Sequence, residues 1–489
     1  MKTKSVSGTG FLNRRSLFGV TSLSVVTAAA LFAGEMERNL SGDHVRRPDG
    51  QRHRSGLPSG YIAGVREAWV ANYTGVFDDE PTAMVVDGSG NVYVTGYTGA
   101  PDHYSYVTIK YNAAGQEEWN FAYNPPNGIS FAAAIAIDHS GNVYVTGTSG
   151  TFGSGDHDYA TIKYSNSGQQ LWVARYNGAP NSDDGATAIA VDGSGNVYVT
   201  GDSGFPSGDY ATVKYDSAGQ QQWVVRYNGP GNGDDRPVAI ATDESGSVYV
   251  TGSSLGAPPG TDYATIKYNN AGQQEWVARY SGPGVGDEPV GMAIDRSGNV
   301  YVTGTSWGSR GISISEYATI KYNNSGEQQW VARYNEPGNG SDANAIAIDG
   351  SGNVYVTGRS LGLDSIWEYA TVKYNSAGQL QWVRRYRAPD STGDAATAIA
   401  VSASGNVYVT GESSGDYGTI KYDSSGQQQW VVRYNGSQGF DDYARGIALD
   451  RRENVYVTGT THQSDVQYDW DFATIKYIPD RIPVPQPRP

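Results

Sequence analysis

The stretch DGSGNVYVTG at residues 192–201 decides the fold, because close copies of it return along the chain. Its VYVTG part is rich in β-branched and aromatic residues, as in a strand, and its DGSGN part has the small polar residues and glycines of a tight turn. The tyrosine of VYVTG recurs at Tyr93, Tyr144, Tyr198, Tyr249, Tyr301, Tyr355, Tyr408 and Tyr456. A period of about fifty residues is typical of a propeller with one blade per repeat.

Each repeat contains four strand-like runs. In the third copy they cover residues 188–191, 196–200, 210–215 and 222–227. Glycine-bearing turns separate the first run from the second and the third from the fourth, so both connections are predicted hairpins. The small, branched first run suits the innermost strand of a ring, and the run that carries tryptophan suits the outer edge.

The two ends of the chain are out of phase with the repeat. A lone tryptophan run at residues 67–73 precedes the first copy, and the last copy stops at its third run, residues 472–477. An N-terminal strand that supplies the missing fourth strand would close a ring and remove its exposed edges. The sequence therefore predicts an all-β, eight-bladed β-propeller of four-stranded blades over residues 61–478, closed by the N-terminal tryptophan strand.

The repeats resemble the SBBP β-propeller repeat family of bacterial and archaeal secreted or surface proteins. The resemblance rests on DGSGNVYVTG at residues 87–96, 192–201 and 349–358 and on DYATIKY at residues 158–164 and 262–268. It implies the propeller fold, although the family is usually described as seven-bladed and this chain has eight copies. The family has no common activity to transfer to these residues.

The N-terminal segment has the pattern of an export signal. Arg14 and Arg15, followed by Leu17 and Phe18, precede a charge-free apolar stretch at residues 19–34. This pattern resembles a twin-arginine signal, and a general secretory signal or an uncleaved anchor fits it as well. We expect residues 1–34 to direct the protein out of the cytoplasm, residues 35–60 to form a disordered linker and residues 479–489 to form a proline-rich tail.

Composition narrows the classes of partner. The formal net charge is −15, and the first sixty residues carry +5, which leaves −20 for the remainder. This excess of acid disfavours nucleic acid as a partner and leaves the N-terminal segment, if uncleaved, as the only membrane contact. The chain has no cysteine and six scattered histidines. We therefore predict a monomer with no metal and no cofactor.

Two repeated features have a structural and a functional interpretation. A glycine four residues before each repeated tryptophan is similar to the docking motif of quinoprotein dehydrogenases, but the chain lacks their unequal insertions, which favours tryptophan as a packing wedge between blades. The DGSGN turns are similar to the start of a calcium loop without its bidentate acid. Ser402 replaces the aspartate in one copy and Arg451-Arg452 fill another, which favours turn chemistry.

An acidic residue precedes the predicted inner strand in seven of the eight repeats. If that strand lines the channel, these side chains ring one mouth of it and attract a cation or a basic partner. The alternative is that each accepts a capping hydrogen bond in a loop between blades. The residues are Asp79, Asp184, Asp235, Glu288, Asp342, Asp394 and Asp442.

The repeats differ most between their second and third runs. The segment is short in the seventh repeat, residues 412–417, and longer beside it, at residues 359–369 and 460–472. A short loop between long ones predicts a notch with aromatic and acidic walls, suited to a sugar or a cation. The candidate ligand-binding residues are Trp307, Trp367, Glu368, Asp416, Tyr468, Asp469 and Trp470. Self-packing of these loops is the alternative.

No pair of acids stands apart from the others, so no catalytic residue is assigned. The sequence favours a non-catalytic binding or scaffold propeller outside the cytoplasm that recognises a protein, glycan or small ligand by its variable loops. A secreted propeller enzyme, either quinone-dependent or polysaccharide-cleaving, is the alternative.

Overall fold

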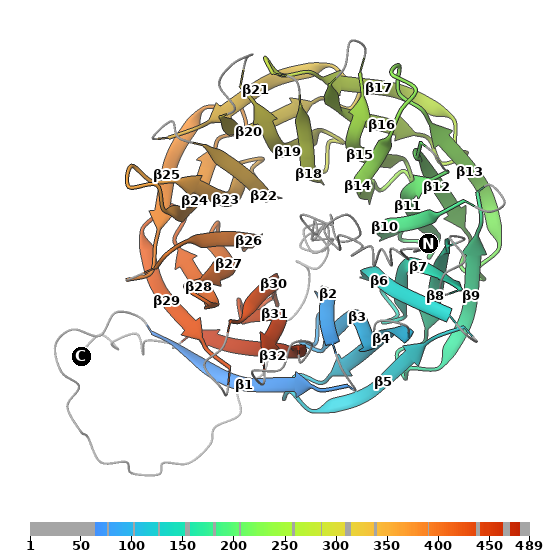
Figure 1. Ribbon diagram of the computed structural model, residues 1–489, viewed down its shortest axis with the longest axis horizontal. Coiled ribbons are helices and arrows are strands. Elements are labelled where there is room, and N and C mark those ends of the chain that lie inside the picture. Colours follow the sequence, from blue (N-terminus) through green and yellow to red (C-terminus); the bar gives the residue numbers. More distant parts are fainter. Residues whose placement is uncertain are drawn as a thin grey trace, which may run out of the picture.

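The protein is a closed ring of eight blades. The computed structural model describes residues 64–479 except 76–77, 101–102, 126–127, 152–156, 179–181, 205–206, 257–259, 285, 309–313, 337–339, 390, 437–440 and 463–469. Within these residues, 32 strands form eight four-stranded antiparallel sheets. The first strand of each sheet faces the centre of the ring and the fourth lies outside (Figure 1). The predicted all-β, eight-bladed propeller is confirmed.

Blades 1 to 7 each consist of four consecutive strands. Blades 1 to 3 are formed by β2 (Asp78–Val86), β3 (Val92–Ala100), β4 (His103–Tyr111), β5 (Glu117–Tyr123), β6 (Gly128–Ile137), β7 (Val143–Thr151), β8 (His157–Tyr164), β9 (Gln170–Tyr176), β10 (Asp184–Val191), β11 (Val197–Ser203), β12 (Asp209–Tyr215) and β13 (Gln221–Tyr227). Blades 4 and 5 are formed by β14 (Asp235–Thr242), β15 (Val248–Leu255), β16 (Thr261–Tyr268), β17 (Gln274–Tyr280), β18 (Asp287–Ile294), β19 (Val300–Trp307), β20 (Ser315–Tyr322) and β21 (Gln328–Tyr334). Blades 6 and 7 are formed by β22 (Ser341–Ile348), β23 (Val354–Leu361), β24 (Trp367–Tyr374), β25 (Leu380–Tyr386), β26 (Asp394–Val401), β27 (Val407–Ser413), β28 (Asp416–Tyr422) and β29 (Gln428–Tyr434).

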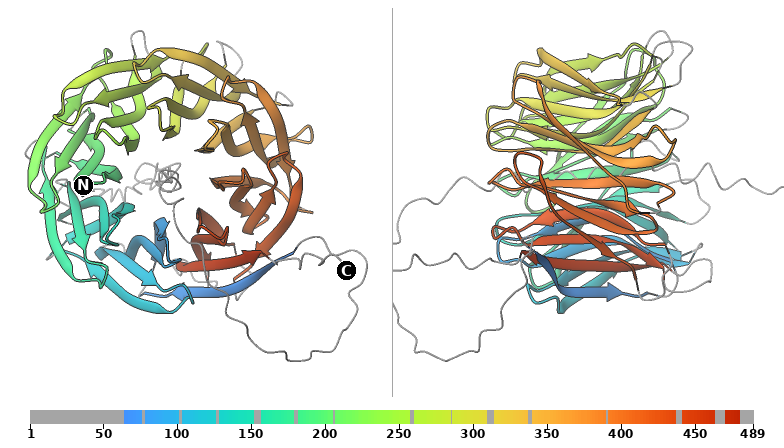
Figure 2. Two further views of the ribbon diagram at one scale, coloured as in Figure 1. Left: turned by 180° about the vertical axis from the view of Figure 1, so that it is seen from behind. Right: turned by 90° about the vertical axis from the view of Figure 1, so that its left-hand side faces the viewer.

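Blade 8 joins the two ends of the described chain. It consists of β30 (Tyr443–Leu449), β31 (Val455–His462), β32 (Trp470–Pro479) and β1 (Val65–Tyr73). β1 pairs with β32 in antiparallel register from Val65 opposite Pro479 to Tyr73 opposite Phe472. Figure 2 shows the blue first strand beside the red last one in both views. The offset in the sequence therefore closes the ring as predicted.

The inner strands begin earlier than the sequence pattern indicated. In blade 3 the pattern predicted a start at residue 188, and β10 starts at Asp184. A β-bulge between Ala186 and Ala188 interrupts the two-residue alternation on which the prediction depended. The bulged Thr187 donates a hydrogen bond from its hydroxyl to the Pro237 carbonyl oxygen of blade 4, at 3.0 Å. The bulge thus links neighbouring blades.

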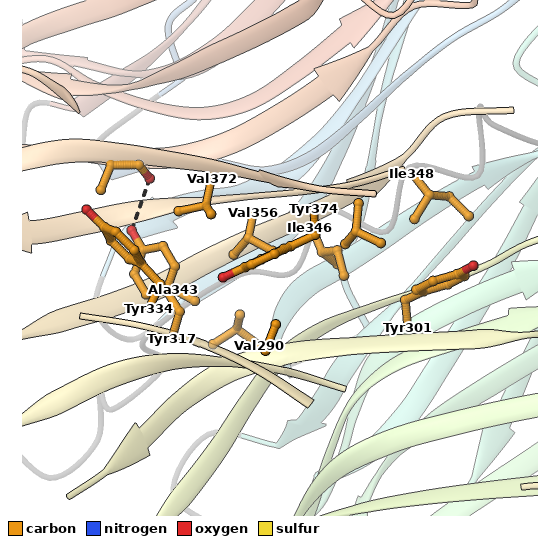
Figure 3. Close-up of a cluster of buried hydrophobic side chains, with 13 residues drawn as sticks. Val290, Tyr301, Tyr317, Tyr334, Ala343, Ile346, Ile348, Val356, Val372 and Tyr374 are labelled. Atoms are coloured by element: carbon orange, nitrogen blue, oxygen red, sulfur yellow. Dashed lines mark hydrogen bonds between the residues drawn. The ribbon is translucent and has the colours of Figure 1, made fainter. Parts of the chain in front are cut away.

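The hydrophobic core is divided into layers between neighbouring blades. One layer combines Tyr301 and Tyr317 of blade 5 with Val354 and Val356 of blade 6, all fully buried (Figure 3). A buried tyrosine needs a hydrogen-bond partner, and the Tyr317 hydroxyl donates to the Ala370 carbonyl oxygen of blade 6 at 3.0 Å. Each seam between blades is therefore held by apolar packing and by specific hydrogen bonds.

The repeated tryptophans pack between blades, as predicted. The Trp172 indole of blade 2 donates to the Ser217 carbonyl oxygen of blade 3 at 3.2 Å. It lies over Gly219, where a Cβ atom would be 2.7 Å from the ring and where φ is +82°. Only glycine suits that position, because it gives the indole room and adopts positive φ without strain. The glycine-to-tryptophan spacing is therefore a packing signal.

The DGSGN turns hold themselves together without an added ion. In blade 3, Asp192 accepts hydrogen bonds from the backbone N–H groups of Ser194 and Asn196, at 2.9 Å each, and from the Tyr198 hydroxyl at 3.0 Å. Every side-chain oxygen of this aspartate has a protein donor, since the Asn196 amide also donates to it at 2.7 Å. This arrangement supports the turn interpretation of the motif.

Blade 7 has Ser402 in place of that aspartate, and a residue from blade 8 replaces its carboxylate. Glu453, at φ +59°, reaches across the seam and accepts hydrogen bonds from Ser404 at 2.6 Å, Asn406 at 3.0 Å and Tyr408 at 2.7 Å. Burial alone would raise the pKa of Glu453, but these hydrogen bonds outweigh it and lower the pKa from 4.5 to about 2. The Glu453 carboxylate of blade 8 thus accepts the hydrogen bonds of the corresponding turn in blade 7.

Replacing this carboxylate should weaken the seam between blades 7 and 8. We expect Glu453→Gly to lower the free energy of unfolding by about 2–3 kcal/mol at pH 7, because the hydroxyl of the buried Tyr408 and the Ser404 and Asn406 side chains lose a charged acceptor. Adding Ser402→Asp should recover most of the loss, because it restores the arrangement of the other turns. A lowered pKa stabilises the fold above pH 4.5 and loses this effect as the pH falls toward 2, so the cost of Glu453→Gly should shrink in acid. Urea unfolding at several pH values measures both effects.

Candidate functional site on the loop face

The variable hairpins between second and third strands lie at one end of the blades, which we call the loop face. The inner strands also begin at this end, because Asp184 at the start of β10 pairs with Ser203 at the end of β11, and Ser203 pairs with Asp209 at the start of β12. The predicted acidic row and the predicted notch therefore belong to the same face.

Five residues of the acidic row are buried. Asp79, Asp184 and Asp235 are 0% exposed, and Asp394 and Asp442 are at most 1% exposed. Each accepts a hydrogen bond from a backbone N–H in the loop that arrives from the preceding blade; the Gly229 N–H donates to Asp235 at 2.6 Å. Their position matches the capping alternative for this row.

Glu288 and Asp342 occupy a different position from the other five. In blades 5 and 6 the buried position belongs to Asp287, 1% exposed, and Ser341, 0% exposed. Glu288 and Asp342 follow one residue later, and Glu288 is exposed. The sequence contains a signal for the buried position. The buried residue lies two positions before a proline or an alanine of the repeat, as Asp235 does before Pro237 and Asp287 before Pro289.

Glu368 and Asp416 take part in an ion pair that recurs between third and fourth strands. Glu368 pairs with Arg385 at 2.8 Å and Asp416 with Arg433 at 2.7 Å. Burial raises the pKa of Asp416, and Arg433 opposes that rise. The side chains of both acids are less than one-fifth exposed. These contacts join the third and fourth strands within blades 6 and 7 at the loop face.

Glu368 also lines a hollow between blades 5 and 6. The hollow has a volume of about 720 Å³, and its lining includes Glu336, Leu363, Asp364 and Arg385. Leu363 is 85% exposed at the tip of the β23–β24 hairpin. Glu368 thus lies on the blade 5 side of the hairpin.

Two of the candidate tryptophans lie over glycines of the loop face. Trp307 is 36% exposed, and a Cβ atom at Gly286 would be 3.1 Å from its ring. A Cβ atom at Gly393, just before the first strand of blade 7, would be 3.9 Å from the Cβ atom of Trp367, and the Arg359 guanidinium lies 4.4 Å from the centre of the Trp367 indole. Arg359 is itself paired with a carboxylate of blade 6, Asp342, at 2.9 Å. One face of Trp367 is thus covered by an arginine.

Trp470 lies on the other side of blade 7. Its indole stacks on the His462 ring, with 4.4 Å between ring centres, and tilts against Tyr443 at 5.6 Å. It is half-buried, so loop self-packing accounts for part of its environment. Tyr468 and Asp469, the two other candidates in this segment, lie outside the described residues.

The hairpin of blade 7 is short, as predicted. Two residues, Ser414 and Gly415, separate β27 from β28, and both have positive φ, as a two-residue turn of mirror-image type requires. The Asp441 carboxylate of blade 8 lies against this turn, where a Cβ atom at Gly415 would be 2.7 Å from it. The short blade 7 turn therefore lies between Trp367 of blade 6 and Asp441 of blade 8.

Three charged residues that sequence reasoning missed lie at this turn. Glu412 of β27 is half-buried, and burial, together with Asp441 and Asp394, raises its pKa. Arg359 of blade 6 and Arg445 of blade 8 are close enough to oppose that rise. We call the set Arg359, Trp367, Glu412, Asp441, Tyr443, Arg445 and Trp470 the blade-7 surface.

A signal for these residues was present in the repeats. The residue directly after VYVTG is Thr148, Ser253, Thr305 or Thr460 in half of the copies and becomes Arg359 and Glu412 in blades 6 and 7. Arg445 fills the bulge position that Thr187 and Thr397 occupy in blades 3 and 7. Arg359, Glu412 and Arg445 are thus charged residues at positions that are small in other copies, and they cluster around blade 7, whereas Asp202 is a further charged residue of this kind in blade 3.

Within the described part of the chain, no group of three or more histidine or acidic side chains has an arrangement that could hold a metal ion. The same residues contain no helix that is long and apolar enough to cross a membrane.

Comparison with known protein families finds one repeat model that these segments match. A model described as a beta-propeller repeat, SBBP, matches residues 73–104, 172–206, 222–258, 275–310, 329–364 and 429–465. The six matches together cover less than half of the chain. Each SBBP match begins in the fourth strand of one blade and ends at or near the connection between the second and third strands of the next, so the sequence repeat straddles two blades. The structure contains eight blades, two more than the matched segments.

Solved structures are similar to this chain in fold alone. Two structures of Sqt1 from Chaetomium thermophilum have TM-scores of 0.55 and 0.51 at 10% and 11% identity. The matches cover 85% of this chain and 98% and 100% of those chains. A polysaccharide lyase, described as a PL25 ulvanlyase, has a TM-score of 0.43 at 12% identity over 74% of this chain and 95% of its own. No curated protein sequence matches the chain.

Proposed function

We propose that this protein is a non-catalytic propeller that acts outside the cytoplasm and binds a carbohydrate at the blade-7 surface. The observation that carries the proposal is that Trp367 belongs to blade 6 and Trp470 to blade 8, the two blades that flank the short blade 7 turn, and that Glu412 lies beside this turn. The export-like pattern at Arg14 and Arg15 supports the location.

The chemistry of the blade-7 surface suits a sugar. Sugar rings have apolar faces that stack on indole and phenol rings, and their hydroxyl groups need charged or polar partners at fixed places. Glu412 offers acceptor oxygens, and Arg359 and Arg445 offer donors on the two sides of it. At the position of Glu412, blades 2, 4 and 5 have Thr148, Ser253 and Thr305, whereas blade 3 has another acid, Asp202. Blade 7 combines its acid with an arginine, Arg359, at the same position of the neighbouring blade 6.

A glycan array with the labelled full chain tests this function. We expect binding to a restricted set of glycans and at least about a tenfold loss of affinity in Glu412→Gln, because the neutral amide removes a charged acceptor. Glu336→Gln is the matched control, since Glu336 is exposed on the blade 5 side, away from the blade-7 surface, and should bind like the wild type. An array without any bound glycan, from protein that is folded by circular dichroism, would contradict the proposal.

A polysaccharide-cleaving enzyme is the second candidate, and one observation favours it. Burial raises the pKa of Glu412 while Asp441 lies nearby and exposed. Two carboxyl groups with different environments are the usual pair for glycoside hydrolysis. Mass spectrometry of the bound glycans after incubation separates the candidates: unchanged glycans support binding alone, and shortened glycans that persist with Glu336→Gln but not with Glu412→Gln support the enzyme.

A further inference from the structure

The fourth strands are tied to neighbouring blades by a recurring arginine and tyrosine. In blade 3, Arg226 of β13 donates to the Tyr176 hydroxyl of blade 2 at 3.0 Å, and the next residue, Tyr227, accepts a hydrogen bond from Arg279 of blade 4 at 2.8 Å. Corresponding bonds join blades 1 and 2, blades 4 and 5, and blades 5 and 6. A typical fourth strand is therefore held by side-chain hydrogen bonds on both sides of its blade.

β1 alone among the eight fourth strands lacks an arginine on both sides. All eight of these strands lie within the described residues. β1 has Asn72 at its own arginine position, and blade 1 has Ala122 at the position that would reach Tyr73. The Tyr73 hydroxyl instead hydrogen bonds with Thr98 of blade 1. β1 is therefore held mainly by its ladder with β32 and by the Trp69 wedge.

The connection from β1 to β2 is short and tightly packed. Four residues, 74–77, separate these strands, whereas six to eight separate the corresponding strands from blade 2 onward. A Cβ atom at Gly75 would overlap the Thr98 hydroxyl and the Asp79 carboxylate, so the closed connection needs glycine there. Short, crowded hinges favour the exchange of a strand between two copies of a chain, because the hinge extends in the exchanged form.

The ladder between β1 and β32 is also the last one that the chain can form. Every other ladder within a blade joins strands that follow each other in the sequence, whereas Tyr73 and its partner Phe472 are about 400 residues apart. Contacts between such distant residues form late, because the intervening chain must first be ordered. The edge of β32 stays open until then, and an open edge pairs with any strand that fits it.

The position of β1 is specific for a strand with its own sequence. The Trp69 ring packs against Tyr111 of blade 1 and Tyr456 of blade 8, with 6.4 and 6.2 Å between ring centres, and lies over Gly115. Its indole N–H donates to the Ala113 carbonyl oxygen at 3.2 Å. A strand without this tryptophan would leave a cavity between blades 8 and 1. This specificity favours a second copy of the chain over an unrelated strand.

We propose that β1 is an exchangeable strand, and that the partner it fits is a second copy of this chain. In the exchanged dimer, β1 of each copy pairs with β32 of the other copy in the register of the closed ring and places its Trp69 between blades 8 and 1 there. The two forms contain the same ladder and the same wedge, so they differ mainly at the hinge. By mass action, the closed monomer predicted from the sequence gives way to the dimer as the protein concentration rises.

Refolding of mixed isotopic chains with one cysteine pair tests the exchange. The chain has no cysteine, and Arg66 and Ile478 lie opposite each other in the ladder, so Arg66→Cys with Ile478→Cys adds one disulfide that reports on it. Equal amounts of light and isotopically heavy full chains are unfolded in urea, mixed, refolded at two concentrations about a hundredfold apart and oxidised. In the exchanged dimer, half of the disulfide-linked peptides should join a light chain to a heavy one.

We expect the mixed-isotope fraction to rise in proportion to the protein concentration while the monomer predominates, together with a dimer peak of the cysteine-free wild type in size-exclusion chromatography. Leu255→Cys with Thr261→Cys is the matched control, because these residues are also opposite each other but belong to consecutive strands of blade 4. Their disulfide should stay within one chain. Links that join only chains of one isotope in the folded Arg66 and Ile478 variant, or an equal mixed fraction in the control, would overturn the proposal.

Two hinge variants test the exchange in opposite directions. Gly75→Ala should raise the dimer-to-monomer ratio about tenfold or more, because the added methyl group crowds the closed hinge alone. A Gly-Ser-Gly insertion after Gly75 should lower the ratio, because a longer hinge closes within one chain without crowding. An unchanged ratio in the insertion variant would contradict exchange at this hinge, and this result does not depend on whether Gly75→Ala folds.

Discussion

Deletion of residues 1–75 is expected to prevent cooperative folding of the ring. The deletion removes β1, which forms the outer strand of blade 8 and the ladder that runs along β32 from Val65 opposite Pro479 to Tyr73 opposite Phe472. It also removes the Trp69 wedge, whose indole packs on Gly115 and donates to the Ala113 carbonyl oxygen of blade 1 at 3.2 Å. Loss of one packed tryptophan costs about 3–5 kcal/mol, and the lost ladder adds to it, which together approach the whole stability of a typical domain.

Deletion of residues 1–60 is the matched control, because it keeps all of β1. We expect this shorter deletion to unfold at nearly the temperature of the full chain in differential scanning calorimetry. The longer deletion should show no cooperative transition, or one that is lowered by tens of degrees and accompanied by aggregation through the exposed edge of β32. Equal melting temperatures for the two deletions would contradict closure by the N-terminal strand.

The architecture was predictable because the same pattern of strands and turns recurs eight times in the sequence. The turn glycines, the small inner run and the tryptophan run each fix one strand, and the unmatched runs at the two ends determine how the ring closes. The starts of the inner strands were not predictable from alternation. A bulge such as that between Ala186 and Ala188 shifts the faces of the strand by one residue.

The same one-residue shift decides which of two neighbouring residues in the acidic row is buried, and the sequence alone did not determine this. Whether Asp287 or Glu288 points into the seam depends on the register with β19, and the structure buries Asp287. The partners of Glu453 lie in the neighbouring blade 7, where the repeat departs from its pattern at Ser402. A single sequence shows such departures, but it does not show which of them meet in space.

Trp367 and Trp470 should carry a large share of carbohydrate binding. A buried aromatic residue at the centre of a binding surface contributes about 2 kcal/mol or more, so each ring accounts for about thirtyfold in affinity. Arg359 covers one face of Trp367, and His462 and Tyr443 cover part of Trp470. These contacts hold the rings in place, and we expect their loss to lower the melting temperature by only a few degrees.

The most direct test of the binding claim is a comparison of glycan-array profiles for the wild type, Trp367→Ala with Trp470→Ala, and the control Phe121→Ala. Phe121 is 40% exposed on the outer strand of blade 1, far from the blade-7 surface, so its loss should leave the profile unchanged. We predict that the double variant is folded, with a melting temperature within a few degrees of the wild type, and retains no detectable binding to the glycans that the wild type binds. A folded double variant that binds all of those glycans as the wild type does would show that the blade-7 surface is not the binding site.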